Sequence, residues 1–345
     1  MKYRLLGRTG LYVSELCLGT MTFGDQGFWK VMGGLGQEAV NTLVRQAFDG
    51  GVNFIDTADV YSLGVSETLT GQAIKSLGLP RDELVIATKA FGPMSETKIN
   101  ARGQSRYHLM NELDASLKRL QVDHIDLYQL HGYDPLTPLE DVLATLNDMV
   151  RSGKVRYVGL CNMAAWQIMK GLAISEKNGW SRFESVQAYY TVAGRDLERE
   201  VLPLVHDQQL GLMVWSPLAG GLLSGKFSAD GKGPEGARRA SFDFPVVDKV
   251  RAFKVVDAMR PIAQSHQASV AQVALAWLLS RPQVSSVIIG AKTPAQLQDN
   301  LGASALALSP QDLQLLDDVS KLPPEYPGWM LAMQGQYSAK PPVKD

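Results

Sequence analysis

Polar side chains with acid–base chemistry stand at the ends of three consecutive apolar runs in the sequence. Asp56, Lys89 and His131 each end such a run, and Tyr61 follows Asp56 by five positions. A lysine ammonium lowers the pKa of a nearby tyrosine from about 10, and an aspartate keeps that lysine charged. A neutral histidine can hydrogen-bond a carbonyl oxygen. Together the four groups would form a general acid aimed at a carbonyl that is about to gain a hydride.

Each of these residues has an ordinary structural explanation when it is considered alone. Lys89 could belong to a structural ion pair, His131 could be a satisfied core histidine, and Tyr61 could be any loop tyrosine. Their joint occurrence at the ends of consecutive strands favours the catalytic interpretation.

The elements that would position these residues alternate between strand and helix. The segments expected as strands are 15–20, 52–56, 84–89, 125–131, 155–162, 185–189, 212–216 and 287–290. The segments expected as helices are 37–50, 67–77, 106–120, 138–151, 164–177, 197–208 and 269–279. Ser105 and Ser269 are expected N-caps, and Pro294 and Pro310 suit the first turns of two further helices. The strands are nearly continuous apolar runs, as in a parallel sheet that is covered on both faces.

This alternation predicts an α/β fold, a (β/α)₈ TIM barrel. An open dinucleotide-binding sheet would carry G-x-G-x-x-G after its first strand, and the sequence GTMTFG at 19–24 does not fit that pattern. Segments 3–6 and 11–14 flank a glycine-containing turn and predict an N-terminal β-hairpin. We expect residues 1–345 to form a single domain, with the barrel at about 15–322 and a tail at 323–345.

Three long segments follow the first, third and seventh strands. They cover 22–36, 91–104 and 222–245. In a TIM barrel the loops after strands meet at the C-terminal face, where active sites lie, so all three point at the same mouth.

Composition limits the partners and the compartment. The formal net charge of −1 supplies no basic excess for nucleic acid or for an anionic membrane surface, so neither is an expected partner. Cys17 and Cys161 lie in apolar strands and read as buried, reduced thiols. We expect no targeting leader and no membrane span, and hence a cytoplasmic protein. The sequence does not define the oligomeric state.

The sequence resembles the aldo-keto reductase family over about residues 1–322. The motifs that carry this resemblance are GTM at 19–21, NFIDTA at 53–58 with Tyr61, TK at 88–89, DLYQLH at 126–131, GKVRYVG at 153–159, Gln187, WSPLAGGLLSGK at 215–226, and IGA at 289–291 with Asn300. The resemblance implies that Tyr61 is the proton donor, that Lys89 and Asp56 tune it, and that His131 orients the carbonyl. The hydride would come from a nicotinamide that is bound without a Rossmann fold.

The resemblance also implies a set of cofactor contacts. They fall on Gly19, Thr20, Met21, Asp56, Asn162, Gln187, Trp215, Ser216, Pro217, Leu218, Gly220, Gly221, Leu222, Ser224, Lys226, Gly290, Lys292, Gln296 and Asn300. Asn162 and Gln187 would bond the carboxamide, Trp215 would stack on the nicotinamide, and 216–226 would wrap the pyrophosphate. Trp215 alone would read as core.

Several positions depart from the family's pattern. Cys161 stands where many relatives have Ser, and Ser62 stands where Gly is common. Gln296 stands where relatives often place an Arg for the adenosine 2′-phosphate, and Lys292 can meet that phosphate only as a point charge. NADP(H) is the expected cofactor, with NAD(H) as a second option.

Aromatic and apolar residues in the long segments are candidates for the substrate pocket. They are Phe23, Trp29, Phe91, Trp329 and Met330, and each could equally be loop packing. An apolar pocket would accept an aromatic or polycyclic carbonyl. The 323–345 tail could cover the barrel mouth or contact a neighbouring subunit.

The leading function is NADP(H)-dependent, reversible reduction of aldehydes and ketones. The alternative is a cofactor-binding regulatory subunit that resembles potassium-channel β subunits, with slow turnover; the lack of a long N-terminal extension counts against it. A metal-dependent barrel hydrolase is disfavoured, because the sequence has no His-x-His pair and no second carboxylate cluster at strand ends.

Overall fold

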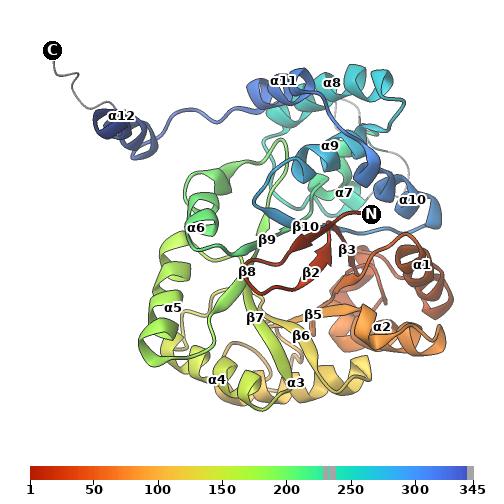
Figure 1. Ribbon diagram of the computed structural model, residues 1–345. Helices are drawn as coiled ribbons and strands as arrows, with labels where there is room; N and C mark the ends of the chain where they lie inside the picture. The colour runs from red at the N-terminus through yellow and green to blue at the C-terminus, as the bar shows by residue number, and fades with distance from the viewer. Residues whose placement is uncertain (228–232, 234–237, 340–345) are drawn as a thin grey trace.

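Eight parallel strands close into a barrel in the order β10-β3-β4-β5-β6-β7-β8-β9 (Figure 1). The computed structural model describes residues 1–227, 233 and 238–339. The barrel strands are β3 (Leu16–Gly19), β4 (Phe54–Asp56), β5 (Val85–Ala90), β6 (Ile125–Leu130), β7 (Val155–Cys161), β8 (Phe183–Tyr189), β9 (Gly211–Trp215) and β10 (Val284–Ile289). The predicted TIM barrel is confirmed, and so is the antiparallel N-terminal hairpin of β1 (Tyr3–Leu5) and β2 (Tyr12–Ser14).

Helices surround this barrel. They are α1 (Gln37–Asp49), α2 (Val65–Ser76), α3 (Arg106–Leu120), α4 (Leu139–Arg151), α5 (Ala165–Asn178), α6 (Val201–Asp207), α7 (Arg238–Ser241), α8 (Lys249–Ser265), α9 (Val270–Leu279), α10 (Pro294–Gly302), α11 (Pro310–Ser320) and α12 (Gly328–Ala339). Short 3₁₀ turns are η1 (Gly27–Val31), η2 (Tyr61–Gly64), η3 (Arg81–Glu83), η4 (Asp196–Glu198), η5 (Ala219–Ser224) and η6 (Ala303–Ala305). The predicted caps Ser105 and Ser269 accept backbone N–H groups, and Pro294 and Pro310 lie in first turns.

The helical prediction is wrong at several places. The expected helix 197–208 is divided into η4 and α6, because Pro203 is tolerated only in a first turn. Helix α8 is not predicted at all, although Val255, Val256 and Met259 of its apolar face are buried. Pro261 lies inside α8, and a proline there normally signals a helix end.

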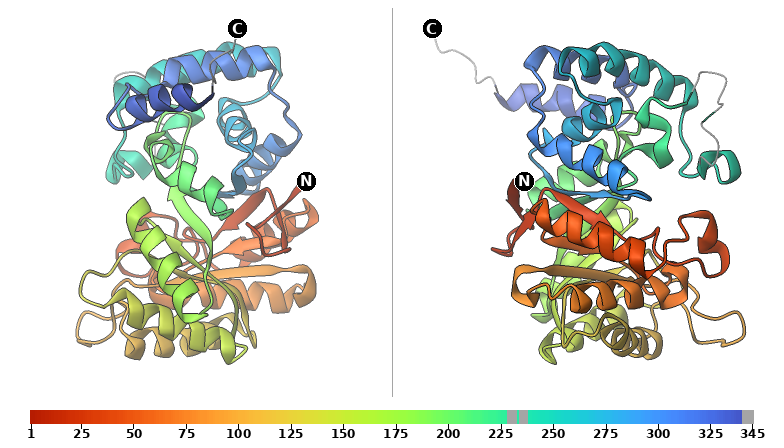
Figure 2. Two further views of the ribbon diagram at one scale, coloured as in Figure 1. Left: turned by 60° about the vertical axis from the view of Figure 1, so that its left-hand side comes forward. Right: turned by 90° about the vertical axis from the view of Figure 1, so that its right-hand side faces the viewer.

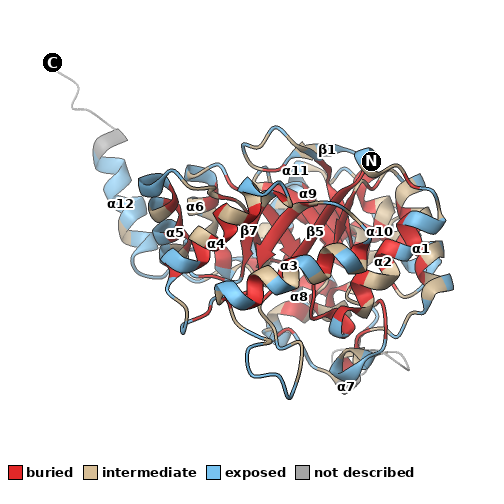
Figure 3. Cartoon of the chain, turned by 90° about the horizontal axis from the view of Figure 1, so that it is seen from below, coloured by how far each residue is buried: buried red, intermediate tan, exposed pale blue. Residues whose placement is uncertain are grey.

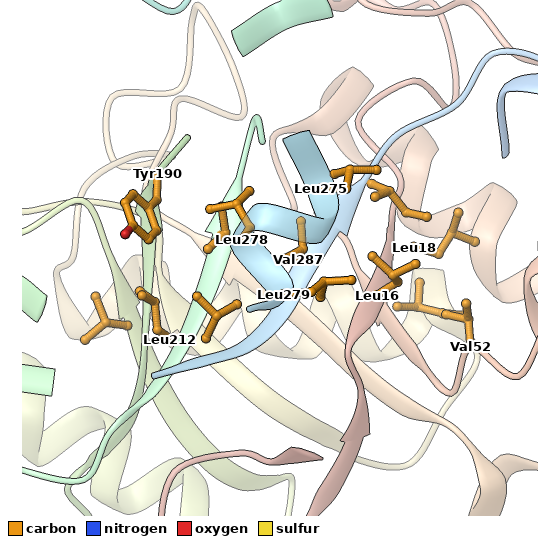
Figure 4. Close-up of a cluster of buried hydrophobic side chains, with 14 of the residues drawn as sticks. Leu16, Leu18, Val52, Tyr190, Leu212, Leu275, Leu278, Leu279 and Val287 are labelled. Carbon is orange, nitrogen blue, oxygen red and sulfur yellow. The ribbon is translucent and has the colours of Figure 1, made fainter. Parts of the chain in front are cut away.

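The core between barrel and helices is apolar, and α9 supplies a large share of it. Figure 4 shows the α9 side chains Leu275, Leu278 and Leu279 over the barrel residues Leu16, Leu18, Leu212 and Val287. Figure 3 shows the same arrangement across the molecule, with buried strands inside and exposed residues on the outer helix faces. Removal of these branched side chains from water is the main driving force that closes the barrel.

The interior of the barrel has an apolar layer at its N-terminal end. Phe54, Val85, Leu127 and Met213 face inward there, and Leu6 of the hairpin packs against the same cluster. Side chains alternate along a strand, so the next inward positions are reached two residues later on each strand. Those positions carry the polar residues of the site.

The three long segments meet at the end of the barrel that lies opposite the N-terminal hairpin. The right-hand view of Figure 2 shows the segments after β3, β5 and β9 extending on that side. Residues 228–232 and 234–237 of the third segment, and 340–345 of the tail, lie outside the described residues. No helix among the described residues is long and apolar enough to cross a membrane.

Candidate active site

The four residues singled out by their chemistry lie together at the C-terminal end of the barrel. Asp56 follows Phe54 by two residues on β4, and Lys89 follows Val85 and Ala87 on β5, in the same inward series. His131 directly follows β6, and its backbone N–H donates to the Ala90 carbonyl at 3.1 Å. The alternation of the strands therefore places acid, lysine and histidine above the apolar layer.

Lys89 is the centre of a buried network. Its Nζ donates to Asp56 Oδ2 at 2.7 Å, to the Thr57 carbonyl at 2.7 Å and to Tyr61 Oη at 3.2 Å. These three bonds use all three ammonium donors. Burial alone would lower the pKa of Lys89, but the interactions with Asp56, Tyr61 and Cys161 together outweigh burial, and the pKa lies above its usual value. The lysine is therefore charged, as expected.

Two glutamines support the other oxygen of Asp56. Gln129 Nε2 donates to Asp56 Oδ1 at 3.1 Å, and Gln187 Nε2 donates to the same oxygen at 2.9 Å. Gln129 lies two residues before His131 on β6, and the sequence reasoning did not single it out. Cys161 Sγ lies 3.9 Å from Gln129 Oε1, and both cysteines are free and buried, as predicted.

The pKa of Tyr61 differs from the expectation. Burial raises it above the usual value near 10, and the Lys89 ammonium offsets only part of that rise. Lys89 does lower the pKa of Tyr61, as predicted, but burial raises that pKa by more, so the net shift is upward. Tyr61 keeps its proton at neutral pH, next to a cation that stabilises the tyrosinate once the proton leaves.

His131 presents a neutral ring beside the tyrosine. The two ring centroids lie 5.7 Å apart in an edge-on arrangement. Burial, with a smaller effect from the Lys89 charge, lowers the pKa of His131 to about 3. The imidazole is therefore uncharged at neutral pH and can donate a neutral hydrogen bond to a carbonyl oxygen.

Trp215, at the end of β9, lies next to Asn162. The indole N–H donates to Asn162 Oδ1 at 2.9 Å. Asn162 has a positive φ of 53°, which turns it out of the β7 direction toward the barrel mouth. Gln187 belongs to the same edge, because its carbonyl accepts the Asn162 N–H at 3.1 Å. The structure thus brings together three of the residues expected at a nicotinamide.

The segment after β9 has an unusual backbone. Ser216, Ala219, Gly220 and Gly221 all have positive φ angles, of 51°, 49°, 66° and 95°. A Cβ on Gly220 would lie 2.6 Å from the Arg238 guanidinium, so only glycine fits there. The backbone N–H groups of this segment bond within it: those of Ala219 and Gly221 donate to the carbonyls of Ser216 and Leu218, at 2.8 Å and 2.9 Å.

The other expected cofactor residues lie around this segment, at or just after the ends of β3 and β10, or on α10. Lys226 and Gln296 are exposed, and Asn300 Nδ2 donates to the Gly290 carbonyl at 3.4 Å. Thr20 is fully buried with its hydroxyl bonded to Ser66, and Pro217 and Leu222 are buried. Met21 packs against the Tyr61 cluster. The remaining expected residues, Gly19, Leu218 and Ser224, lie in β3, in the turn after β9 and in η5.

Two arginines of α7 were missed by the sequence reasoning. Arg239 is buried and donates to the carbonyls of Ala219 at 2.7 Å and Pro245 at 3.0 Å. Partial burial and the positive charge of Arg238 both lower the pKa of Lys292, so these two cations share one region. The consecutive arginines at 238–239 are the sequence signal that could have shown this cluster.

Of the five aromatic and apolar residues expected at a substrate pocket, the structure places two beside the catalytic group. The Trp29 ring lies 5.0 Å from the Tyr61 ring, centroid to centroid. Phe91 is partly buried, with its ring against Gly132, next to His131.

Three of those expectations are wrong. Phe23 is fully buried in the main core, and its backbone N–H donates to the Thr20 carbonyl at 2.9 Å. Trp329 and Met330 belong to α12, which Figures 2 and 3 show at the side of the barrel, away from the mouth. The tail leads there because Glu325 pairs with Arg199 beside α6, at 2.6 Å.

The aromatic residues at the mouth form a chain that the sequence did not reveal. Phe28 packs on Trp29 at 5.8 Å and on Phe242 at 5.1 Å, and Phe242 packs on Phe244 at 5.5 Å. Phe244 stacks on Trp215 at 5.8 Å with 9° between the ring planes. The chain joins the segment after β3 to the segment after β9, and it runs from Tyr61 to Trp215.

Comparisons with known proteins agree with this site. The model of the aldo/keto reductase family matches residues 15–321. The uncharacterized oxidoreductase YrpG of Bacillus subtilis is 37% identical over 326 residues, covering 92% of this chain and 96% of the relative. Versiconal hemiacetal acetate reductase of Aspergillus parasiticus is 34% identical, covering 92% and 96%. A probable voltage-gated potassium channel subunit beta of Arabidopsis thaliana is 35% identical, covering 95% and 99%. The chain therefore belongs to the aldo/keto reductase family.

Proposed function

We propose that the protein reduces aldehydes and ketones to alcohols, reversibly, with NADPH as the reductant. The observation that carries this proposal is the buried contact of 3.2 Å between the Lys89 ammonium and the Tyr61 hydroxyl, with Asp56 behind the lysine and His131 beside the tyrosine. A protonated phenol next to a fixed cation and a neutral imidazole is a general acid for a carbonyl oxygen.

The roles of the residues follow from their charges. The nicotinamide would supply the hydride to the carbonyl carbon. His131 donates a hydrogen bond that orients the carbonyl, and Tyr61 passes its proton to the oxygen as negative charge develops there. Lys89 stabilises the resulting tyrosinate, and Asp56 holds Lys89 in place. Burial of Asp56, Tyr61 and Lys89 keeps water from competing for the bonds between them.

The residues present fit a phosphorylated dinucleotide. Lys226, Arg238 and Lys292 supply positive charge around the glycine-containing segment after β9, and such charge suits phosphate groups. Arg238 and Lys292 place two cations in one region, and this charge compensates for Gln296, where relatives often have an arginine. We therefore propose NADP(H) rather than NAD(H), with Lys292 near the 2′-phosphate.

Replacement of Lys292 by alanine is expected to lower kcat/KM for NADPH but not for NADH. Lys292→Ala should lower kcat/KM for NADPH about tenfold, because a point charge at the 2′-phosphate is lost, and it should change the value for NADH less than about twofold. Lys226→Ala is the matched control, because a pyrophosphate contact serves both cofactors equally. Equal losses for NADPH and NADH in Lys292→Ala, or a clear NADH preference of the wild type, would contradict the NADP(H) assignment.

The aromatic chain indicates the class of substrate. Trp29 lies against Tyr61, and the rings of Phe28, Phe242 and Phe244 continue from it across the mouth; such surfaces bind flat apolar groups. We propose an aromatic or polycyclic aldehyde or ketone as the preferred substrate.

Consumption of NADPH with a panel of carbonyl compounds tests the function directly. An aromatic aldehyde is expected to show a kcat/KM about tenfold above that of a straight-chain aldehyde with the same number of carbons, because ring contacts add to apolar burial. A panel with no NADPH consumption at all would contradict a reductase. A preference for the straight chain would contradict only the substrate class.

The second candidate function is a cofactor-binding regulatory subunit. It is supported by the relative that is named as a potassium channel subunit beta. Under that function the protein would still bind NADPH tightly, and single turnover with an aldehyde would be far slower than cofactor binding.

The two free, buried cysteines suit either function in a reducing compartment, and we propose that the protein is located in the cytoplasm.

A further inference from the structure

Asp59, which stands between Asp56 and Tyr61 in the sequence, is a second buried acid in this region. Asp59 is fully buried, and its backbone N–H donates to the carbonyl of Lys89 at 3.0 Å. Its Oδ1 accepts the N–H of Val60 at 2.5 Å, while Oδ2 has no hydrogen-bond partner within the described residues. A buried carboxylate oxygen without a donor is costly, and a protonated carboxyl avoids much of that cost.

The surroundings of Asp59 also favour its uncharged form. The charges of Glu67 on α2 and Glu112 on α3 act against the ionised form of Asp59, and the charge of Arg119 on α3 acts in its favour. Arg119 is already committed, with Nε to Glu67 at 2.5 Å and Nη2 to Glu112 at 3.1 Å. Burial, and then repulsion from Glu67 and Glu112, raises the pKa of Asp59 well above its usual value.

Arg119 also contacts the turn that follows Tyr61. Ser62, Leu63 and Gly64 have consecutive positive φ angles of 49°, 52° and 89°, which two non-glycine residues rarely adopt. The position that a Cβ would take on Gly64 lies 2.7 Å from Cδ of Arg119, so the arginine stem rests directly on this turn. Strained backbone of this kind persists only where its surroundings hold it.

We propose that Asp59 and the Glu67–Arg119 pair form a positioning cluster that holds the Tyr61 turn from behind and keeps the Tyr61 hydroxyl on Lys89. The inference rests on the proposed role of Tyr61 as proton donor. An ionised Asp59 would add an anion with no cation to match it, because the three donors of Lys89 are already used.

Two substitutions separate shape from charge at this position. Asp59→Ala removes the support and is expected to lower kcat by about 10- to 100-fold, because a small displacement of a catalytic group has effects of this size, with KM changed less than about twofold. Asp59→Asn keeps the shape, can donate a hydrogen bond and cannot ionise. It is expected to retain kcat within about threefold and to leave the pH profile of kcat unchanged.

The control is a buried acid at the opposite end of the barrel. Glu15 is buried, accepts from Arg4 at 2.9 Å and lies beside the hairpin. Glu15→Ala should reduce stability without changing kcat. If Asp59→Ala does not fold, Gly64→Ala replaces it, since a methyl there strains the same turn against Arg119 and should lower kcat similarly.

A readout that does not need turnover is the ring signal of Tyr61 in protein labelled with ¹³C-tyrosine, assigned by its loss in Tyr61→Phe. It should shift and broaden in Asp59→Ala and coincide with wild type in Asp59→Asn and Glu15→Ala. Asp59→Asn with the low kcat of Asp59→Ala would overturn the proposal, as would Asp59→Ala with wild-type kcat and ring signal. If wild type shows no turnover, the proposed function fails, and the ring signal still decides whether the cluster positions Tyr61.

Discussion

Tyr61→Phe is expected to lower kcat for carbonyl reduction by about 10²–10⁴-fold, the usual contribution of a positioned general acid. The phenylalanine ring keeps the contacts to Trp29 and His131, so only the hydroxyl on Lys89 is lost. Binding of NADPH, followed by cofactor fluorescence, should be unchanged. Steady-state kinetics with an aromatic aldehyde measures the effect, and normal turnover by Tyr61→Phe would show the mechanism to be wrong.

The pH dependence of the wild type follows from the same residues. His131 has a pKa of about 3 and is uncharged throughout the neutral range, and the pKa of Tyr61 lies above its usual value. The proton to be donated is therefore present at neutral pH and is lost only as the pH rises into the alkaline range. We expect kcat for reduction to be flat between about pH 6 and pH 8 and to fall at higher pH. A fall on the acid side of neutrality would mean that His131 titrates there.

The second large effect is expected when Lys89 is removed. Lys89→Met leaves the Asp56 carboxylate buried with only the amides of Gln129 and Gln187 on its other oxygen, and the Tyr61 hydroxyl without its cation. Breaking one side of a buried ion pair costs about 3–5 kcal/mol. The free energy of unfolding, measured in urea, should fall by about this amount, and turnover should be lost.

The double variant Lys89→Met with Asp56→Asn distinguishes the two consequences. It removes the unpaired charge, so most of the lost stability should return, since a neutral replacement of a buried pair is often tolerated. Turnover should not return, because no cation remains beside Tyr61. If the double variant is as unstable as Lys89→Met, the stability effect comes from lost packing of the lysine stem rather than from the charge.

Local sequence was sufficient to predict the barrel, because each strand is buried on both faces and is therefore a nearly continuous apolar run. Apolar runs predicted all eight strands, and most helix ends were correct to within about two residues, for example at 106–120. The elements that were missed lack an equally clear pattern. Helix α8 contains Pro261, and α12 lies in a tail whose glycine, proline and aromatic residues resemble a loop.

The sequence by itself determined which groups can do the chemistry and that they lie at one end of the barrel. Asp56, Lys89 and His131 end successive parallel strands, and the alternation of side chains then leaves them little freedom. Only the tertiary structure decided what depends on contacts between segments far apart in the chain. Burial from several elements outweighs Lys89 and raises the pKa of Tyr61, and the cluster around Arg119 meets the Tyr61 turn from α3. The sequence did not predict that the aromatic chain joins two loops across the mouth, or that the tail lies at the side of the barrel. No local pattern encodes which distant surface a loop will contact.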